Sequence, residues 1–199
     1  MKYIKGLLVL LLLLNIAGCT KKEETKEEAK EETVTESSEP IYCEITVKDY
    51  GTMKLELYPD IAPLTVENFV KLVNDGFYTD NCFHRIIDGF MIQGGMDTTG
   101  SVEKIKGEFL SNGIVNDLKH TEGVISMARA KDPDSASSQF FIMVGDGSWL
   151  DGDYAAFGKV IEGYEIAVQI AKDAKPIDNN GSIAQEDRPV IESIVIVEK

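Results

Sequence analysis

Residues that commonly carry metal or nucleophilic chemistry are sparse in this chain. Its 199 residues include three cysteines and two histidines, and neither a CxxC pair nor an HExxH sequence occurs. Stretch 146–151 is rich in Asp but places Leu150 where an EF-hand loop needs an oxygen ligand, and stretch 178–189 lacks the closing Glu. We therefore interpret these aspartates as turn residues and expect neither a metal nor a cofactor.

Two smaller features also suggest chemistry that their surroundings do not support. Gly94-Gly95 would suit a phosphate-binding loop, but no Lys-Ser/Thr pair follows it. We expect these glycines to relieve backbone crowding instead. His120 is expected to lie in an exposed loop.

The overall charge limits the classes of partner. The chain has 20 Lys and Arg against 34 Asp and Glu, a formal net charge of −14. Nucleic-acid binding depends on cationic surfaces that displace counterions from phosphates, so we expect no nucleic-acid partner. Hydrophobic residues make up 43% of the chain, which is ordinary for a globular domain.

Residues 1–18 have the features of a targeting segment. Lys2 and Lys5 precede an apolar run at 6–16, which is too short to span a bilayer. The run ends in Ile16-Ala17-Gly18-Cys19, which resembles the lipobox of bacterial lipoproteins. The sequence therefore predicts a lipoprotein signal peptide at 1–18 and lipidation of Cys19. The alternative is an ordinary secretory signal with a chance cysteine.

Residues 19–40 are predicted to join this anchor to a folded domain. Segment 20–39 contains 4 Lys and 8 Glu and almost no apolar side chains, so it cannot bury enough surface to offset its ordering entropy. We interpret it as an acidic tether that holds the domain at 41–199 on the outer side of a membrane. Stable anchoring requires more than one acyl chain.

Alternating apolar residues begin where the acidic segment ends. They occur at every second position on both sides of a turn signal, Asp49-Tyr50-Gly51. These residues are Ile45, Val47, Met53, Leu55 and Leu57. The pattern predicts a β-hairpin.

The rest of the domain alternates between strand and helix signals. Apolar residues at helical spacing, with Gly76 as a stop, predict a helix at 65–74, and a second helix is predicted at 164–174. Short apolar runs predict strands at 83–87, 90–93, 124–128, 139–144, 155–160 and 188–197. Many short strands with two helices predict a mainly β fold, a closed β-barrel capped by helices.

Segment 83–95 (FHRIIDGFMIQGG) closely resembles the signature of cyclophilin-type peptidyl-prolyl cis-trans isomerases. Further matching blocks follow in the family's order: SMARA at 126–130, SQFFI at 138–142, WLDG at 149–152 and FGKV at 157–160. The resemblance covers essentially all of 41–199. It implies an eight-stranded antiparallel β-barrel capped by two α-helices, and isomerisation of X–Pro bonds without a cofactor.

The resemblance also implies residue roles. Arg85, Phe90 and Gln93 match the catalytic positions, with Arg85 as the hydrogen-bond donor to the twisting amide and Gln93 as the group that positions it. The substrate-binding positions are matched by Met91, Ala128, Arg129, Ala130, Gln139, Phe141, Trp149, Leu150 and Tyr154. Arg85 should point into a pocket floored by Phe141. His84 matches a histidine that is not catalytic, so we interpret it as structural.

Three positions depart from the best-known members of the family. Asp88 replaces a proline in the signature turn, Arg129 stands where many members have Asn, and Tyr154 replaces a pocket histidine. We expect activity to persist, because the family's contact at Arg129 is made by the backbone and Tyr154 keeps an aromatic wall. Trp149 matches a position used by cyclosporin, so an inhibitor of that type is a further expected partner, with altered affinity.

Two functions fit these observations. The first is a lipid-anchored isomerase that assists folding outside the cytoplasm, with proline-containing polypeptides as substrates. The second is a non-catalytic module that uses the same groove as a chaperone or scaffold. A solute-binding lipoprotein is excluded, because such proteins close two lobes around their ligand and one small barrel does not have them.

We expect a monomer. Cys43 and Cys82 could pair, or could be free thiols in apolar strands.

Overall fold

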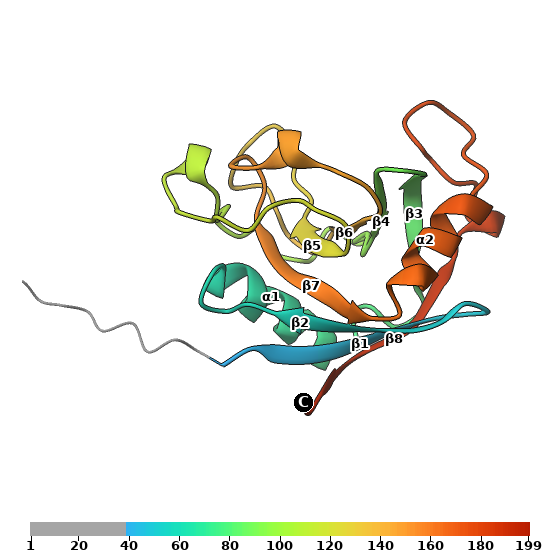
Figure 1. Cartoon of the computed structure of the whole chain (residues 1–199), viewed down its shortest axis with the longest axis horizontal. Helices are drawn as coiled ribbons and strands as arrows, with labels where there is room; N and C mark the ends of the chain where they lie inside the picture. The colour runs from blue at the N-terminus through green and yellow to red at the C-terminus, as the bar shows by residue number, and fades with distance from the viewer. Residues whose placement is uncertain (1–38) are drawn as a thin grey trace, which may run out of the picture. The chain divides into compact units, whose positions relative to one another are not determined.

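The structure is a computed structural model that describes residues 39–199 (Figure 1). Eight strands form a closed barrel in the order β1-β2-β7-β5-β6-β4-β3-β8, and neighbouring strands are antiparallel. The strands are β1 (Ile41–Val47), β2 (Gly51–Leu57), β3 (Asn81–Ile87), β4 (Met91–Gly94), β5 (Val124–Met127), β6 (Phe140–Met143), β7 (Ala156–Glu162) and β8 (Val190–Val197). The predicted barrel is confirmed. The predictions of a signal peptide at 1–18, of lipidation at Cys19 and, up to residue 38, of a tether fall outside the described residues.

The hairpin of β1 and β2 forms where the alternating pattern predicts it. Ile45 pairs with Met53, and Val47 pairs with Gly51. Every second side chain is buried in the barrel, namely Cys43, Ile45, Val47, Met53, Leu55 and Leu57. The turn uses left-handed backbone at Asp49 (φ 65°), a conformation that a short polar side chain tolerates.

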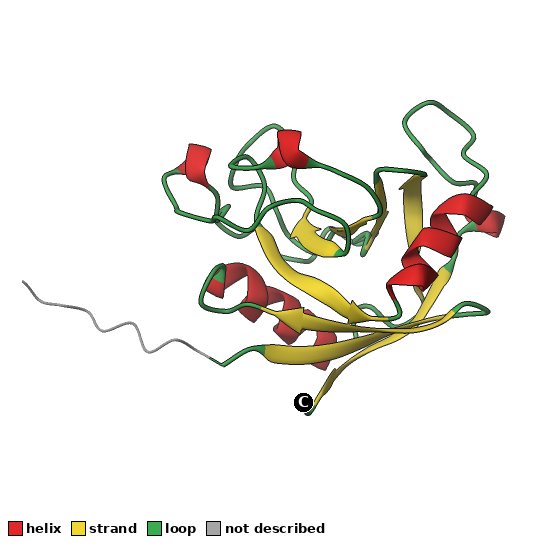
Figure 2. Ribbon diagram, viewed as in Figure 1, coloured by secondary structure: helices red, strands yellow, loops and turns green. Residues whose placement is uncertain are grey.

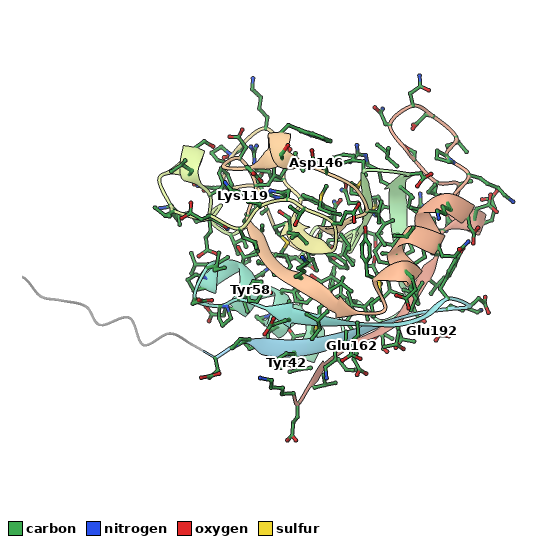
Figure 3. All side chains as sticks on the ribbon, viewed as in Figure 1. Tyr42, Tyr58, Lys119, Asp146, Glu162 and Glu192 are labelled. Atoms are coloured by element: carbon green, nitrogen blue, oxygen red, sulfur yellow. The ribbon has the colours of Figure 1, made fainter. Side chains whose placement is uncertain are left out.

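The outer face of this hairpin is polar. The hydroxyls of Tyr42 and Tyr58 donate to the two carboxylate oxygens of Glu56, at 3.1 and 3.2 Å (both tyrosines are labelled in Figure 3). Partial burial together with the Glu56 charge raises the pKa of Tyr58 to about 12. The alternation therefore separates a dry inner face from a hydrogen-bonded outer face.

The helices α1 (Pro63–Asn74) and α2 (Tyr164–Asp173) lie on opposite sides of the view in Figure 2. The first begins at Pro63 rather than at the predicted residue 65, because proline suits the first helical turn, where its missing N–H is no loss. Val66, Phe69 and Val73 of α1 are buried, as their spacing predicts. In residues 39–199, no helix combines the length and the apolar composition needed to span a bilayer.

A distant carboxylate caps the first turn of α1. Ala62 precedes the helix and offers no side-chain cap. Instead, the carboxylate of Glu108 accepts hydrogen bonds from the backbone N–H groups of Leu64 (3.1 Å) and Thr65 (2.8 Å) and from the Thr65 hydroxyl (2.7 Å). Glu108 is only 2% exposed. It therefore satisfies two N–H groups of the first helical turn, which have no partner within the helix.

Aromatic rings fill the centre of the barrel. The ring centroid of Phe69 lies 5.2 Å from that of Tyr78 and 5.3 Å from that of Phe157. The ring of Phe140 meets Phe69 edge-on, with 5.6 Å between the centroids. The Tyr78 hydroxyl donates to the carbonyl of Ser138 at 2.9 Å. The barrel interior is thus a packed core, and any binding site must lie on its outside.

Both cysteines in the described part of the chain are free thiols, which settles the pairing question. Cys43 is fully buried, and burial raises the pKa of its thiol to about 12. A thiol this buried is protonated and chemically inert.

Three short 3₁₀ helices were not predicted: η1 (Leu110–Asn112), η2 (Ser148–Leu150) and η3 (Gln185–Asp187). Each is a single turn, too short to show periodicity.

Replacing the capping carboxylate tests this account of α1. In Glu108→Gln, an amide NH₂ would face donors that now meet an oxygen, so the free energy of unfolding should fall by about 1–3 kcal/mol. Urea unfolding followed by circular dichroism measures this change. The matched control is Glu103→Gln, which alters an exposed carboxylate of the same loop. Equal effects of the two substitutions would contradict the capping role.

Candidate functional site

Nine predicted site residues surround one pocket of about 260 Å³. Its lining, which we call the arginine pocket, consists of Arg85, Phe90, Met91, Gln93, Ala128, Arg129, Phe141, Leu150 and Tyr154. The other three predicted residues lie beside it. Trp149 packs against Phe90 at 5.2 Å between ring centroids, Gln139 bonds to Gln93, and Ala130 follows Arg129 in the chain.

Strand register aligns the centre of the arginine pocket. Arg85 on β3 pairs with Gln93 on β4, and Gln93 pairs with Phe141 on β6. Phe141 in turn pairs with Ser126 on β5. Directly paired residues of antiparallel strands project to the same face, so these side chains form one row across four strands. A register irregularity in β3, between Phe83 and Arg85, precedes the row.

Polar contacts fix the guanidinium of Arg85. Its Nε donates to the carbonyl of Asn180 at 2.8 Å, and its Nη1 donates to Oε1 of Gln93 at 3.0 Å. Nη1 also lies 3.9 Å from the sulfur of Met91. The Nε2 of Gln93 donates to Oε1 of Gln139 at 3.0 Å, which orients the Gln93 amide. The planar, permanently charged group is therefore held at the pocket edge with little freedom.

The apolar part of the arginine pocket is a small cluster of its own. Met91 and Phe141 are 1% and 5% exposed and form its floor. Phe90, Leu150 and Ala128 are partly buried around them. Tyr154 meets the Phe141 ring edge-on at 5.9 Å and supplies the aromatic wall expected of it. A compact apolar ring of substrate would find a hydrophobic surface here on several sides.

His120 supports this floor, and the prediction that it lies in an exposed loop is wrong. It is 1% exposed, and its ring stacks on Phe141 at 6.1 Å. Its Nδ1 lies 3.0 Å from Oδ1 of Asp151, and its Nε2 lies 2.9 Å from the hydroxyl of Ser126. A carboxylate only accepts, so Nδ1 carries the proton and Nε2 accepts from Ser126. Burial lowers the pKa of His120 and keeps the ring neutral.

Arg129 is held differently from Arg85. Its guanidinium carbon lies 5.0 Å above the ring of Phe109 and 4.6 Å above the ring of Tyr154. Its Nε donates to the carbonyl of Asp153 at 2.9 Å, and its Nη1 donates to the carbonyl of Ala130 at 3.0 Å. The Arg129 side chain therefore forms part of the pocket wall, whereas the resemblance implied only a backbone contact.

The glycine pair at the end of β4 relieves crowding, as expected. A side chain on Gly95 would bring its Cβ within 2.6 Å of the carbonyl oxygen of Ser138, and Gly95 has left-handed backbone (φ +76°). The hydroxyl of Ser138 also donates to the Gly95 carbonyl at 2.8 Å. Only glycine fits where these two segments meet beside the pocket.

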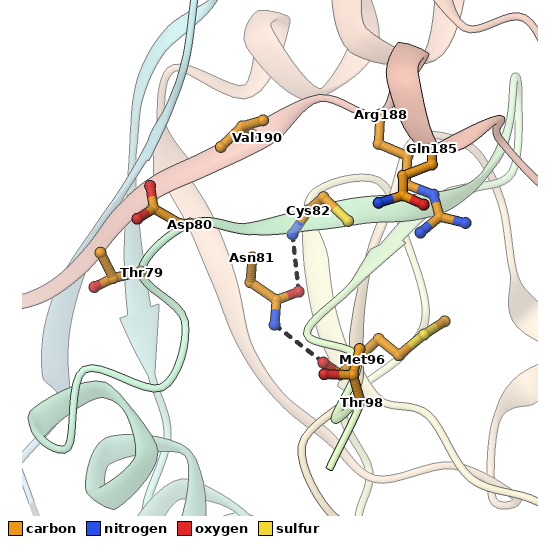
Figure 4. Close-up of a pocket in the computed structure, with 9 residues that line it drawn as sticks. All are labelled: Thr79, Asp80, Asn81, Cys82, Met96, Thr98, Gln185, Arg188 and Val190. Carbon is orange, nitrogen blue, oxygen red and sulfur yellow. Dashed lines mark hydrogen bonds between the residues drawn. The ribbon is translucent and has the colours of Figure 1, made fainter.

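A second cavity, of about 360 Å³, opens where β3 and β8 meet. Figure 4 shows its lining, in which Asn81 donates to the Met96 carbonyl and accepts from the backbone of Cys82. It also contains Arg188, whose Nε donates to the carbonyl of Ile183. This Cys82 cavity is larger than the arginine pocket but has no aromatic floor, so we assign the site to the arginine pocket. In residues 39–199, no group of three or more His, Cys, Asp or Glu is placed to share a metal ion.

Several residues that support the site were not foreseen from the sequence. His120, Phe109 and Asn180 contact site residues from segments far away in the chain, and Ser126 bonds to His120. Asn180 acts through its backbone carbonyl, for which no side-chain signal exists. His120 and Asp151 lie 31 positions apart, a separation at which no local pattern links them.

The sequence matches a known protein family. The family profile described as cyclophilin type peptidyl-prolyl cis-trans isomerase/CLD matches residues 42–198. A peptidyl-prolyl cis-trans isomerase of Acinetobacter baylyi is 44% identical over 126 residues, which are 61% of this chain and 67% of that protein. Peptidyl-prolyl cis-trans isomerase B of Escherichia coli is 36% identical over 162 residues, 75% of this chain and 96% of that protein.

Solved structures of cyclophilin-type isomerases have the same fold as this chain. A cyclophilin-type peptidyl-prolyl cis-trans isomerase of Cryptosporidium parvum superposes with a TM-score of 0.68 at 32% identity, covering 80% of this chain and 99% of that one. Its structure in the presence of the dipeptide Ala-Pro gives a TM-score of 0.67 at 32% identity, covering 79% and 99% of the two chains.

The neutral state of His120 makes stability depend on pH. Its pKa in the folded protein lies below the usual 6.5, so the unfolded chain takes up a proton first as pH falls. The free energy of unfolding should therefore decrease between about pH 7 and pH 5, by at most about 1.4 kcal/mol per pH unit for one proton. Urea unfolding across this range measures the slope.

The His120→Gln variant should show a shallower slope than the wild type. His84 provides the comparison, because burial also lowers its pKa. His84→Gln should remove a separate part of the dependence of the free energy of unfolding on pH. An unchanged pH dependence in His120→Gln would contradict the neutral, buried assignment.

Proposed function

The chain belongs to the cyclophilin-type peptidyl-prolyl cis-trans isomerase family and is itself such an isomerase, and we propose that its catalysis takes place in the arginine pocket. The observation that carries this proposal is the single row of Arg85, Gln93 and Phe141 across three paired strands. It places a fixed cation, the amide that orients it and an apolar floor within one pocket.

The reaction needs electrostatic help but no bond cleavage. Rotation about an X–Pro bond is opposed by amide resonance, with a barrier of about 18–20 kcal/mol. Without a catalyst, exchange takes roughly tens to hundreds of seconds. In the twisted transition state the prolyl nitrogen has a localised lone pair. A donor that meets this lone pair stabilises the transition state more than the planar ground state.

Arg85 is the proposed catalytic donor. Its Nε and Nη1 are engaged by Asn180 and Gln93, so the guanidinium does not have to reorganise when the amide twists. Gln93 acts as a positioning residue through that hydrogen bond. Phe90, Met91, Phe141 and Leu150 hold the prolyl ring still by apolar contact while the acyl side rotates.

The wider groove is proposed to hold the polypeptide around the proline. A structural relative was solved in the presence of the dipeptide Ala-Pro, and it supports a proline-containing ligand for this chain. The N–H groups of Ala128 and Ala130 already donate to the Gln139 carbonyl and the Ser135 hydroxyl. These two N–H groups are therefore not available to the peptide. We propose that other backbone groups of this segment contact the peptide, together with Tyr154 and the exposed ring of Trp149.

We propose further that the enzyme works outside the cytoplasm, anchored to a membrane by lipid on Cys19. The sequence supports this by the order of its features: a positive start, a short apolar run, Ile16-Ala17-Gly18-Cys19, and then an acidic segment. An anchored isomerase in that location would act on polypeptides that fold after export.

Removing the proposed donor tests the mechanism. In Arg85→Ala, kcat/KM for a short X–Pro peptide should fall roughly 10²–10³-fold, the usual cost of losing one preorganised donor. Arg85→Lys should not restore the rate, because lysine cannot bridge Asn180 and Gln93 as a planar group does. A protease-coupled assay measures these rates.

The matched control is Arg188→Ala, which removes an arginine from the Cys82 cavity and should keep the wild-type rate. Circular dichroism verifies folding of each variant. If Arg85→Ala keeps the wild-type rate, the proposed role is wrong. If the wild type binds peptide tightly but turns it over no faster than buffer, the protein is a binding module.

The anchor has a separate test. Cells expressing the full chain should incorporate radiolabelled fatty acid into this protein, and Cys19→Ala should lose the label, because the thiol is the only proposed attachment point. Cys82→Ala is the control, since it removes a half-buried thiol of the folded domain and should keep the label. Unchanged labelling of Cys19→Ala would contradict the lipid anchor.

A further inference from the structure

The arginine pocket is positively charged within an acidic protein. Its charged lining residues are Arg85 and Arg129, and no carboxylate lines it. The ion pairs in residues 39–199 join Lys71 to Asp75 and Lys119 to Asp151. Neither pocket arginine takes part in them, although the whole chain has a formal net charge of −14. The pocket therefore presents positive charge that the described part of the protein does not neutralise.

Arg129 is held in place by neutral groups. Its guanidinium lies over two aromatic rings, of Phe109 and Tyr154, and two backbone carbonyls accept from Nε and Nη1. These contacts orient the group but leave its charge. A guanidinium has five N–H donors, and those on Nη2 make no hydrogen bond within residues 39–199. A fixed, planar cation with open donors is well suited to bind a carboxylate.

The two arginines have separate tasks. Arg85 belongs to the network of Asn180, Gln93 and Met91, which orients it toward the reacting amide. Arg129 makes no bond to that network and follows β5 on another side of the pocket. The nearest acidic residue in its contacts is Asp153, which meets it through the backbone carbonyl and not through the carboxylate. Arg129 is therefore free to meet a charge brought by the substrate.

We propose that Arg129 is a specificity-determining residue, which makes the enzyme prefer polypeptides with Asp or Glu close to the isomerised proline. This inference rests on the proposed function, since it places the proline in the arginine pocket. The substrate carboxylate would accept hydrogen bonds from Nη2 while the prolyl ring lies on Phe141. Basic residues at the same position are disfavoured by repulsion from both arginines.

Water can reach the Arg129 guanidinium, and this limits how strongly an acidic peptide can be preferred over a neutral one. An ion pair between groups that water can reach is worth up to about 1 kcal/mol, so an acidic peptide should bind roughly threefold to fivefold more tightly than its neutral counterpart. Screening removes most of this gain when the Debye length falls from about 30 Å to about 3 Å, between about 0.01 M and 1 M salt.

The experiment compares acetylated X–Pro peptides that carry Glu, Gln or Lys at one position, scanned over the two residues before proline and the one after. Trp149, the chain's single tryptophan, packs on Phe90 at the pocket, so its fluorescence reports Kd without turnover. The protease-coupled assay gives kcat/KM for the same peptides. At low salt, at least one position should favour Glu over Gln by roughly threefold or more, with Lys weakest.

Two variants assign the preference to its residue. Arg129→Met keeps an unbranched chain that can contact the two rings but removes the charge, so its Glu-to-Gln ratio should fall to about one, whereas Arg129→Lys should keep part of the ratio. Lys48→Gln is the matched control, because it removes one exposed positive charge from the β1–β2 turn and should keep the full ratio.

The outcomes separate this inference from the proposed function. Equal Kd values for Glu and Gln peptides at every position, with normal turnover, would overturn the preference alone. So would a ratio that survives in Arg129→Met. Absent turnover with a salt-sensitive Kd ratio would overturn the catalytic proposal and support the preference.

Discussion

The hydrogen bonds from Arg85 to the Asn180 carbonyl and to Gln93 are the constraint on which the site depends. A free arginine side chain samples many rotamers, and a catalyst that must order it during the reaction gains little. Here the register of β3, β4 and β6 has already aligned Arg85, Gln93 and Phe141, so that folding fixes the geometry before substrate arrives. A shift of one residue in any of these strands would turn its side chain to the opposite face and separate cation from floor.

The barrel makes this alignment possible because its interior is filled. The aromatic core around Phe69 and Phe140 leaves no room inside, and the pocket forms on the outer surface from a separate small apolar cluster. His120 links that cluster to the rest of the fold, since it stacks beneath Phe141 and bonds to both Ser126 and Asp151. A neutral histidine suits this position because one nitrogen donates and the other accepts. The loop with Asp151 is thereby tied to the strand with Ser126.

Local patterns were sufficient to predict most of the fold. Period-two alternation identified the β1–β2 hairpin, and helical spacing identified the buried face of α1, because both report which side of an element meets the core. The contacts that were missed join residues distant in sequence. Glu108 caps α1 from 43 positions away, and Asn180 holds Arg85 from 95 positions away. His120 lies in a loop by sequence, but its burial results from a stacking partner on β6 that no local pattern reveals. The site residues were predicted from the matched sequence blocks of the family. The part that the Arg129 side chain plays in the pocket wall could not be predicted, because it depends on contacts with Phe109 and Tyr154.

A crystal structure of the protein with a bound X–Pro peptide tests the central claim most directly. The account predicts the prolyl ring against Phe141, with an Arg85 nitrogen about 3 Å from the prolyl amide group and the bonds to Asn180 and Gln93 retained. A guanidinium turned away from the peptide, or a prolyl ring seated in the Cys82 cavity, would contradict it.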